Sequence, residues 1–473
     1  MTNRITRREA IRQAAAIGGG LALGPRGNAA MPAASESQRR PNVIFILSDD
    51  QGPWAAGCCG NSEIRTPNID RLAETGTRFS KFFVSTPVCS PSRANYLTGR
   101  ISSQTGIHEW ISKGNVGPDA EAFTAGEVAY TDVMAENGYN CGLSGKWHLG
   151  DSATPQHGMG FWYAHQQGGG RYNDAPMVRD GQLINEPGYI TDVITDEALR
   201  FLDMQDDAPF CLNVHYTAPH SPWTGHPQDI VDSYDDCPFE SCPQEPKHPW
   251  AIPWADGLLG NREALKGYFA AVTAMDLNIG RIIDRVEKLG LREDTLIVFV
   301  SDNGFSCGHH GFWGKGNGTN PRNMYENSVL VPAVFSQPGA IPQGNVTDAM
   351  VTSYDFLPSL MEHCGLPLPE GRNLPGTSFL PALRGEEMPG NESVIIYDEY
   401  GPVRMIRTHE WKYVHRHPDG PNELYDLARD PGERTNLVDE AKHHALIGDL
   451  RRQMDEWFAR YVVPERDGLK ETY

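Results

Sequence analysis

The stretch Pro41-Asn42-Val43-Ile44-Phe45-Ile46-Leu47-Ser48-Asp49-Asp50 decides the fold class of this chain. Its continuous apolar run predicts a strand that is buried on both faces of a sheet. Residues 295–303 have the same pattern, an apolar run followed by Ser-Asp-Asn. Residues 210–216 are a third candidate strand. Helical patterns occupy residues 191–204 and 261–289 between them. This alternation predicts an α/β fold with a doubly wound sheet.

Acidic side chains come directly after two of the predicted strands. Asp49 and Asp50 follow the first strand, and Asp302 and Asn303 follow the second. Ligands of such sheets gather at the carboxyl ends of the strands. Carboxylates brought together there would repel one another, so a divalent cation is expected between them, and an all-oxygen set favours calcium or magnesium over zinc. A turn or a helix cap is the alternative for either pair alone.

A reactive position is indicated by Cys89-Ser90-Pro91-Ser92-Arg93, which is followed by Leu97-Thr98-Gly99-Arg100. Pro91 suits the first turn of a helix and Gly99 suits its end. Cys89 would then lie at the helix N-terminus, where free N–H groups favour an anion. Arg93 follows one turn later on the same face, and its guanidinium suits a sulfuryl or phosphoryl group. The alternative is a buried, unreactive cysteine.

These two blocks resemble the signature of the type I sulfatases. In that family the cysteine is oxidised after synthesis to formylglycine, an aldehyde whose hydrate attacks sulfate esters. The resemblance implies that Cys89 is the nucleophile and that one calcium ion lies beside it, and it implies a modifying partner, a formylglycine-generating or sulfatase-maturating enzyme. The implied ligands of the ion are Asp49, Asp50, Asp302, Asn303 and the modified Cys89.

Further blocks carry the same resemblance. Gly145-Lys146-Trp147-His148 resembles the block in which the lysine contacts sulfate and the histidine takes a proton from the hydrate. Lys146 and His148 alternate on an expected extended segment, so they are predicted to face the same way. The resemblance implies that His220, in a Pro-His-Ser-Pro loop, contacts the sulfate or protonates the leaving oxygen. It implies that Lys315 shares the leaving-group role with His220. More residues separate Lys315 from Tyr325 than in the simplest form of the pattern.

His310, in Gly308-His309-His310-Gly311, is expected to touch the substrate, with a solvated loop as the alternative. Five tryptophans in Gly/Pro-rich stretches could stack on sugar rings, although core packing is the interpretation favoured for most of them. They are Trp162, Trp223, Trp250, Trp254 and Trp313.

The predicted organisation has three parts. Residues 1–34 carry Arg7-Arg8 and a short apolar run, which is typical of a twin-arginine signal peptide; a basic tail is the alternative. This signal predicts export by the twin-arginine machinery to the periplasm or beyond. Residues 40–385 are expected to form the catalytic domain, with the alkaline-phosphatase-like mixed sheet that the resemblance implies. Residues 386–473 are expected to form a smaller C-terminal α+β subdomain, with an antiparallel sheet and a terminal helix.

The composition limits the classes of molecule that the protein is expected to bind. Asp and Glu number 61 against 41 Lys and Arg, a formal charge of −20, which argues against nucleic acid and anionic membranes. No stretch predicts a permanent membrane span. The nine cysteines show no zinc-type spacing, and a bridge between Cys237 and Cys242 is left open.

The leading hypothesis is therefore a calcium-dependent formylglycine sulfatase that acts on a sulfated carbohydrate. One alternative is a phosphonate or phosphodiester hydrolase that uses the same aldehyde. The other is an unmodified relative that only binds sulfated glycans.

Overall fold

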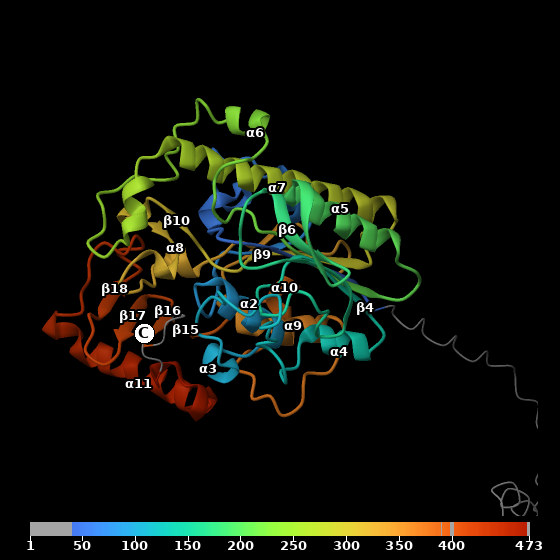
Figure 1. Cartoon of the computed structure of the whole chain (residues 1–473). Coiled ribbons are helices and arrows are strands. Elements are labelled where there is room, and N and C mark those ends of the chain that lie inside the picture. The colour runs from blue at the N-terminus through green and yellow to red at the C-terminus, as the bar shows by residue number, and fades with distance from the viewer. Residues whose placement is uncertain (1–39, 389, 398–401, 471–473) are drawn as a thin grey trace, which may run out of the picture. The chain divides into compact units, whose positions relative to one another are not determined.

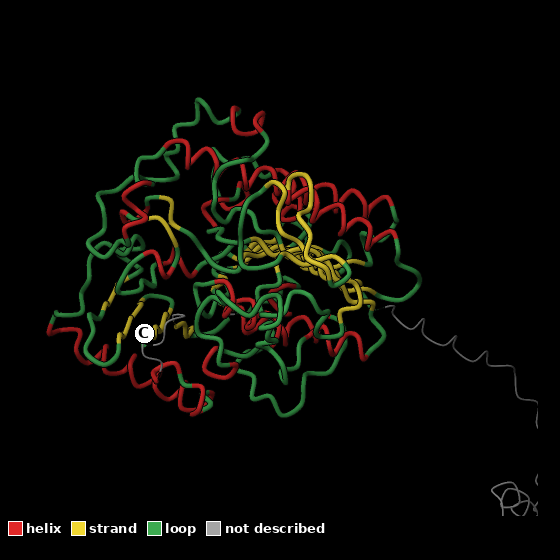
Figure 2. The backbone as a smooth tube through the Cα atoms, viewed as in Figure 1, coloured by secondary structure: helices red, strands yellow, loops and turns green. Residues whose placement is uncertain are grey.

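A computed structural model describes residues 40–388, 390–397 and 402–470. The predicted signal peptide lies outside the described residues. From Arg40 onward the chain forms one compact unit, in which a ten-stranded mixed sheet has helices on both faces (Figures 1 and 2).

The central strands of this sheet are those expected from the apolar runs. β1 (Asn42–Ser48) pairs in parallel with β8 (Phe210–His215) and β9 (Thr295–Ser301), and every residue of these three strands is buried. Val43 and Phe45 face one core of the molecule, whereas Ile44 and Ile46 face another, because side chains alternate along a strand. In spatial order the strands are β13 (Asn345–Thr347), β2 (Thr77–Phe79), β12 (Ala333–Ser336), β9 (Thr295–Ser301), β1 (Asn42–Ser48), β8 (Phe210–His215), β4 (Asn140–Lys146), β5 (Met159–His165), β6 (Asn173–Arg179) and β7 (Gln182–Tyr189).

Helices from distant parts of the chain cover the two faces. One face is covered by α1 (Pro67–Glu74), α5 (Ile190–Asp203) and α7 (Arg262–Lys288). The other is covered by α2 (Cys89–Thr98), α4 (Tyr130–Glu136), α9 (Phe356–His363) and α10 (Leu380–Leu383). The two long predicted helices, 191–204 and 261–289, are thus confirmed within a residue at each end.

The C-terminal part forms an antiparallel sheet, as predicted from its short strands. The strands are β15 (Ser393–Tyr397), β16 (Val403–Thr408), β17 (Trp411–Arg416) and β18 (Glu423–Asp426), and α11 (His444–Tyr461) packs on them. Val394 and Ile396 share a core with Phe83 and Met324 of the larger part, so the two parts pack directly together. The boundary near residue 386 remains a prediction.

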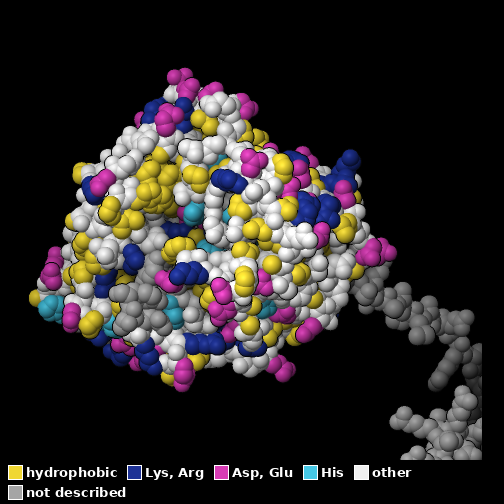
Figure 3. Space-filling model, in the orientation of Figure 1, with side chains coloured by type: hydrophobic (Ala, Val, Ile, Leu, Met, Phe, Trp, Pro, Cys, Tyr) yellow, Lys and Arg dark blue, Asp and Glu magenta, His cyan; other side chains and the backbone are white. Residues whose placement is uncertain are grey.

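The shorter strands and α-helices are β3 (Phe82–Phe83), β10 (Ser306–Cys307), β11 (Trp313–Gly314), β14 (Val351–Thr352), α3 (Ser102–Thr105), α6 (Gln228–Asp232) and α8 (Glu326–Val329), and short 3-10 helices occur in the loops. All nine cysteines are reduced, so Cys237 and Cys242 are not bridged. Within the described part of the chain, no helix has the length and apolarity to cross a membrane. Acidic and basic side chains are interspersed on the face drawn in Figure 3.

Candidate active site

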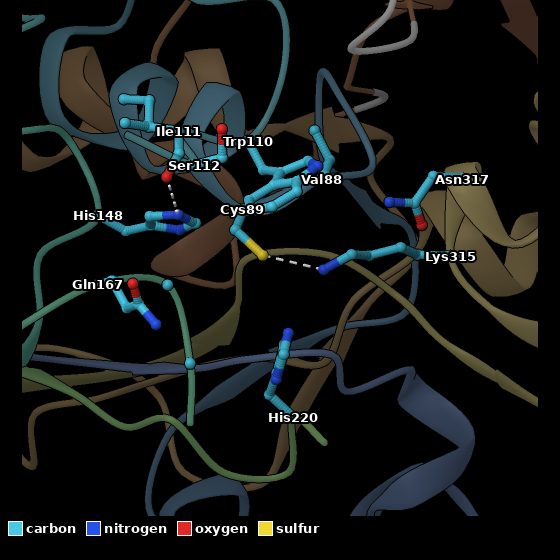
Figure 4. A pocket seen from close by; sticks show the side chains of 12 residues that line it. Val88, Cys89, Trp110, Ile111, Ser112, His148, Gln167, His220, Lys315 and Asn317 are labelled. Atoms are coloured by element: carbon cyan, nitrogen blue, oxygen red, sulfur yellow. Dashed lines mark hydrogen bonds between the residues drawn. The ribbon is translucent and has the colours of Figure 1, made fainter. Parts of the chain in front are cut away.

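Cys89 begins α2, as the position of Pro91 predicted. Val88 before it is extended, and Gly99 ends the helix with a φ of 68° and an N–H bond to the Asn95 carbonyl. Cys89 is only 3 % exposed, and its thiol donates to Asp49 Oδ1 over 3.6 Å. Lys315 Nζ donates to Cys89 Sγ over 2.9 Å (Figure 4).

The acidic pairs after β1 and β9 meet beside Cys89. Because Ser48 pairs with Ser301 in parallel register, the residues that follow the two strands emerge side by side. Carboxylate oxygens of Asp49, Asp50 and Asp302 lie within 4.8 Å of one another. Asp50 adopts a left-handed φ of 69°, and its backbone N–H donates to Asp302 Oδ1 over 3.3 Å.

This cluster fits a hard cation. Asn303 Nδ2 donates to Asp50 Oδ1 over 2.7 Å, while the buried Asn303 Oδ1 has no hydrogen-bond partner among the described residues. Three carboxylates and an unpartnered amide oxygen are the ligands that calcium and magnesium prefer. These donors suit such an ion, and the ligand set itself stays a prediction.

Three cationic side chains surround the same carboxylates. Arg93 Nη2 lies 2.8 Å from Asp302 Oδ2, and Lys315 Nζ lies 2.5 Å from Asp50 Oδ1. Lys146 forms an ion pair with Asp49. Burial alone would raise the pKa of Asp49, but Lys146 holds it well below its usual range.

Charge balance follows from these pairs. Three carboxylates face three cationic side chains, so the protein groups of the site are close to neutral. A divalent cation would make the site positive, which favours an anionic substrate such as a sulfate ester.

The thiol of Cys89 is not activated as it stands. Burial, with a further contribution from the Asp49 carboxylate, raises the pKa of Cys89 to about 12. The thiolate is the nucleophilic form of cysteine, so the unmodified side chain would be a weak nucleophile near neutral pH.

A cavity of about 420 Å³ opens next to Cys89. His148, Gln167, His220 and Lys315 stand around the sulfur in Figure 4, and Trp110 and Val88 form another part of the wall. The residues at the wall are Val88, Cys89, Trp110, Ile111, Ser112, His148, Gln167, Gly168, Gly169, His220, Lys315 and Asn317.

The two cavity histidines are held by backbone carbonyls. His148 Nε2 lies 3.1 Å from the Ile111 carbonyl, and no described residue pairs with its Nδ1. Burial, and then the charge of Lys146, hold the pKa of His148 well below its usual value, so its ring is neutral. His220 Nδ1 lies 2.7 Å from the Ser221 carbonyl, and its Nε2 lies 3.9 Å from Asp50 Oδ2.

The structure brings together the predicted residues Cys89, Arg93, Lys146, His148, His220 and Lys315 around the acidic cluster. The predicted extended segment through Lys146 and His148 is wrong. β4 ends at Lys146, and His148 has a left-handed φ of 59°. Lys146 therefore points to Asp49 and is fully buried, whereas His148 lines the cavity.

His310 is not among the residues that line this cavity. Its ring stacks on Tyr325 with centroids 3.9 Å apart, and its Nδ1 lies 3.1 Å from Arg434 Nη1. Its position therefore gives no support to the predicted contact with substrate.

Sequence reasoning missed part of the cavity wall. A Cβ on Gly168 would lie 2.2 Å from His148 Cε1, and one on Gly169 would lie 2.9 Å from His220 Cε1. Only glycine permits this approach of the backbone to both rings, and the run Gly168-Gly169-Gly170 was the one available signal. Trp110 also lines the cavity, and none of the five tryptophans considered from the sequence does.

Comparisons with known proteins agree with this geometry. The family model described as Sulfatase matches residues 41–366, and the one described as N-sulphoglucosamine sulphohydrolase, C-terminal, matches residues 308–460. The N-acetylglucosamine-6-O-sulfatase of Bacteroides thetaiotaomicron is 29 % identical, over 92 % of this chain and 89 % of that protein. The ulvan-active sulfatase of Formosa agariphila is 28 % identical, over 89 % of this chain and 81 % of that protein.

A solved structure in complex with its substrate D-glucosamine-2-N,6-O-disulfate superposes with a TM-score of 0.77. Its sequence is 26 % identical, and the superposition covers 92 % of this chain and 100 % of that chain.

Proposed function

This chain belongs to the sulfatase family and is a sulfuric ester hydrolase, and from that premise we propose that it removes sulfate from a sulfated carbohydrate. The proposal includes a formylglycine formed from Cys89 and one bound calcium ion. The observation that carries it is the position of Cys89, at a helix N-terminus between the acidic cluster and the Lys315 ammonium. The carbohydrate class is supported by the named substrates of the two relatives and of the superposed structure.

Formylglycine would supply the attacking hydroxyl of its hydrate, and calcium would offset negative charge on the sulfate oxygens. Asp49, Asp50, Asp302 and Asn303 would hold the ion through side-chain oxygens. Arg93 and Lys146 would keep these carboxylates in place, because each pairs with one of them without lining the cavity.

His148 is arranged to accept a proton. Because its Nε2 faces the Ile111 carbonyl, that nitrogen carries the hydrogen, and Nδ1 keeps its lone pair. A neutral imidazole beside Cys89 can therefore act as a general base.

His220 and Lys315 are arranged to assist the leaving group. Both lie at the cavity wall, and Lys315 carries an ammonium with hydrogens to donate. Either group can protonate or stabilise the bridging oxygen as the sulfur–oxygen bond breaks.

Peptide mass spectrometry at Cys89 tests the modification, and turnover of 4-nitrophenyl sulfate tests the activity. Formylglycine at Cys89 together with turnover supports the proposal. Faster turnover of 4-nitrophenyl phosphate or a phenylphosphonate ester would favour the phosphonate or phosphodiester hydrolase. An unmodified cysteine in protein from its natural host, without turnover, would leave a glycan-binding relative.

Calcium is tested by stripping the protein with a chelator. Calcium should restore activity and raise the melting temperature, because an ion that binds the folded state stabilises it. Asp302→Ala should lose both responses. Full activity of metal-free protein, or restoration by zinc alone, would contradict the assignment.

Export and maturation are a separate part of the proposal. The paired arginines Arg7 and Arg8 support export by the twin-arginine machinery, and Cys89-Ser90-Pro91-Ser92-Arg93 supports recognition by a formylglycine-generating or sulfatase-maturating enzyme. Replacing both Arg7 and Arg8 with lysine should retain the protein inside the cell in a fractionation experiment. Unchanged export would contradict the twin-arginine route.

A further inference from the structure

We propose that Trp110 separates two sugar-binding subsites. The Cys89 cavity would take the sugar that carries the scissile sulfate, and a second cavity on the other side of Trp110 would take the neighbouring sugar of the same oligosaccharide. This inference rests on the proposed function, because it assumes a carbohydrate substrate.

The second cavity is formed by one short segment of the chain. Its volume is about 430 Å³, and it is lined by residues 106–113 and Phe123. Trp110, Ile111 and Ser112 also line the Cys89 cavity, so the two spaces share one wall. Each volume is within the range of small-molecule sites, which is about 300–1,000 Å³.

Trp110 offers an apolar platform at this shared wall. Its residue surface is 44 % exposed, although large aromatic side chains are usually well buried. An indole presents a flat apolar face, and a pyranose ring presents C–H groups on one of its faces. Stacking the two would bury apolar surface from both partners. A platform at a wall common to two cavities can contact a sugar on either side.

Polar groups for the sugar hydroxyls lie beside the platform. Glu109 and Lys113 line only the second cavity, and both are exposed. Neither forms an ion pair with another described residue. A carboxylate accepts hydrogen bonds and an ammonium donates them. The pair can therefore bind one sugar hydroxyl as a donor and another as an acceptor. An apolar wall with a few polar groups is typical of a small-molecule site.

The position of the second cavity identifies its occupant. A sugar in it would be separated from the reacting sugar only by the wall at Trp110, which suits two units joined by a glycosidic bond. A monosaccharide substrate would leave this cavity unused. The protein should therefore bind a sulfated disaccharide more tightly than the matching monosaccharide.

Calorimetry with the Cys89→Ala protein tests this preference without turnover. The probes are sulfated mono- and disaccharides prepared from heparin, carrageenan and ulvan. At least one disaccharide should bind about tenfold more tightly than its monosaccharide, as expected when one aromatic anchor is gained. Adding Trp110→Ala or Lys113→Ala should remove most of this gain.

Trp254 provides the matched control. It is also 44 % exposed, but it stacks on Trp223 and lines neither cavity. Adding Trp254→Ala to the Cys89→Ala protein should preserve the tenfold gain. The proposal is overturned if no disaccharide binds more tightly than its monosaccharide, or if Trp110→Ala weakens both probes by the same factor.

Turnover by the wild-type protein separates this inference from the proposed function. If sulfate esters are not hydrolysed but the disaccharide gain is present, the proposed function fails and the second subsite stands. If sulfated sugars are hydrolysed without any disaccharide gain, the proposed function stands and the second subsite fails.

Discussion

At the scale of single residues, Cys89 is the position on which the proposed reaction depends most. Its sulfur contacts Asp49 and Lys315, so one atom lies between the acidic cluster and a cation. Cys89→Ala should lower kcat on 4-nitrophenyl sulfate by about a thousandfold or more, because the attacking group is lost. Cys59→Ala, which changes a partly exposed cysteine outside the cavity, is the control and should keep its activity. Turnover by Cys89→Ala, with an unchanged circular dichroism spectrum, would contradict the assignment.

His220 and Lys315 should matter most when the leaving group is poor. An alkoxide of a sugar needs protonation as the bond breaks, whereas an activated phenolate does not. His220→Ala and Lys315→Ala should therefore each lower kcat about a hundredfold more on a sulfated sugar than on 4-nitrophenyl sulfate. Steady-state kinetics on both substrates check this. An equal loss on the two would leave these residues as binding groups without a role in proton transfer.

The residues of the site could be predicted where a local sequence pattern fixes both the residue type and its place in a helix or strand. Cys89 and Asp302 were found because each follows from a local pattern, a helix start or the end of an apolar strand. The left-handed conformation of His148 could not be predicted, because neighbouring loops determine it. Trp110 was missed for the same reason, since it belongs to an irregular segment that reaches the cavity through tertiary packing alone.

At the scale of elements, α1 is capped by a side chain from another helix. Asp276 of α7 accepts hydrogen bonds from the backbone N–H groups of Asn68 and Ile69, which are among the first of α1. Burial outweighs these bonds and raises the pKa of Asp276 to about 6 from its ordinary value of 3.8. The folded state therefore holds this proton more tightly than the unfolded chain does between pH 4 and 6.

The free energy of unfolding should respond to this proton. Relative to Asp276→Asn, which cannot titrate, the wild type should lose about 2 kcal/mol of stability as the pH rises from 4 to 6. Urea denaturation of both proteins across this range measures the difference. Asp284→Asn, at an exposed position of the same helix, keeps Asp276 and should therefore lose stability over this range as the wild type does. A difference between wild type and Asp276→Asn that stays constant with pH would refute the coupling.

The central elements could be predicted more fully than the edges of the sheet. β1 and β9 are buried along their whole length, so continuous apolar runs mark them, and α7 has a clear apolar face. β7 at one edge is mostly exposed and β13 at the other has three residues, so neither carries an apolar pattern. Their pairing depends on neighbouring strands, and a local pattern does not encode it.

At the scale of the whole molecule, one buried lysine joins the C-terminal sheet to the larger part. Lys412 of β17 is fully buried, donates to the Met324 carbonyl over 2.8 Å, and lies 2.6 Å from carboxylate oxygens of both Glu326 and Glu433. Lys412→Met keeps much of the volume but leaves the buried Glu433 carboxylate and the partly buried Glu326 carboxylate without this partner. It should cost about 3–5 kcal/mol of stability.

Thermal or urea denaturation checks this value. Lys442→Met, at an exposed ion pair with Glu440, should change stability by less than about 0.5 kcal/mol. If Lys412→Met unfolds at the wild-type midpoint, the buried pairs do not stabilise the junction between the two parts.

The bare backbone at Gly168 and Gly169 has a consequence for protein engineering. Any side chain introduced there would displace the imidazole rings of His148 and His220, so a library aimed at new substrates should leave both positions unchanged. Gln167 and Asn317 line the same cavity, and diversity introduced at them would alter its shape with less risk to the two rings. A selection experiment that randomised this wall should therefore recover glycine at 168 and 169 in every active clone.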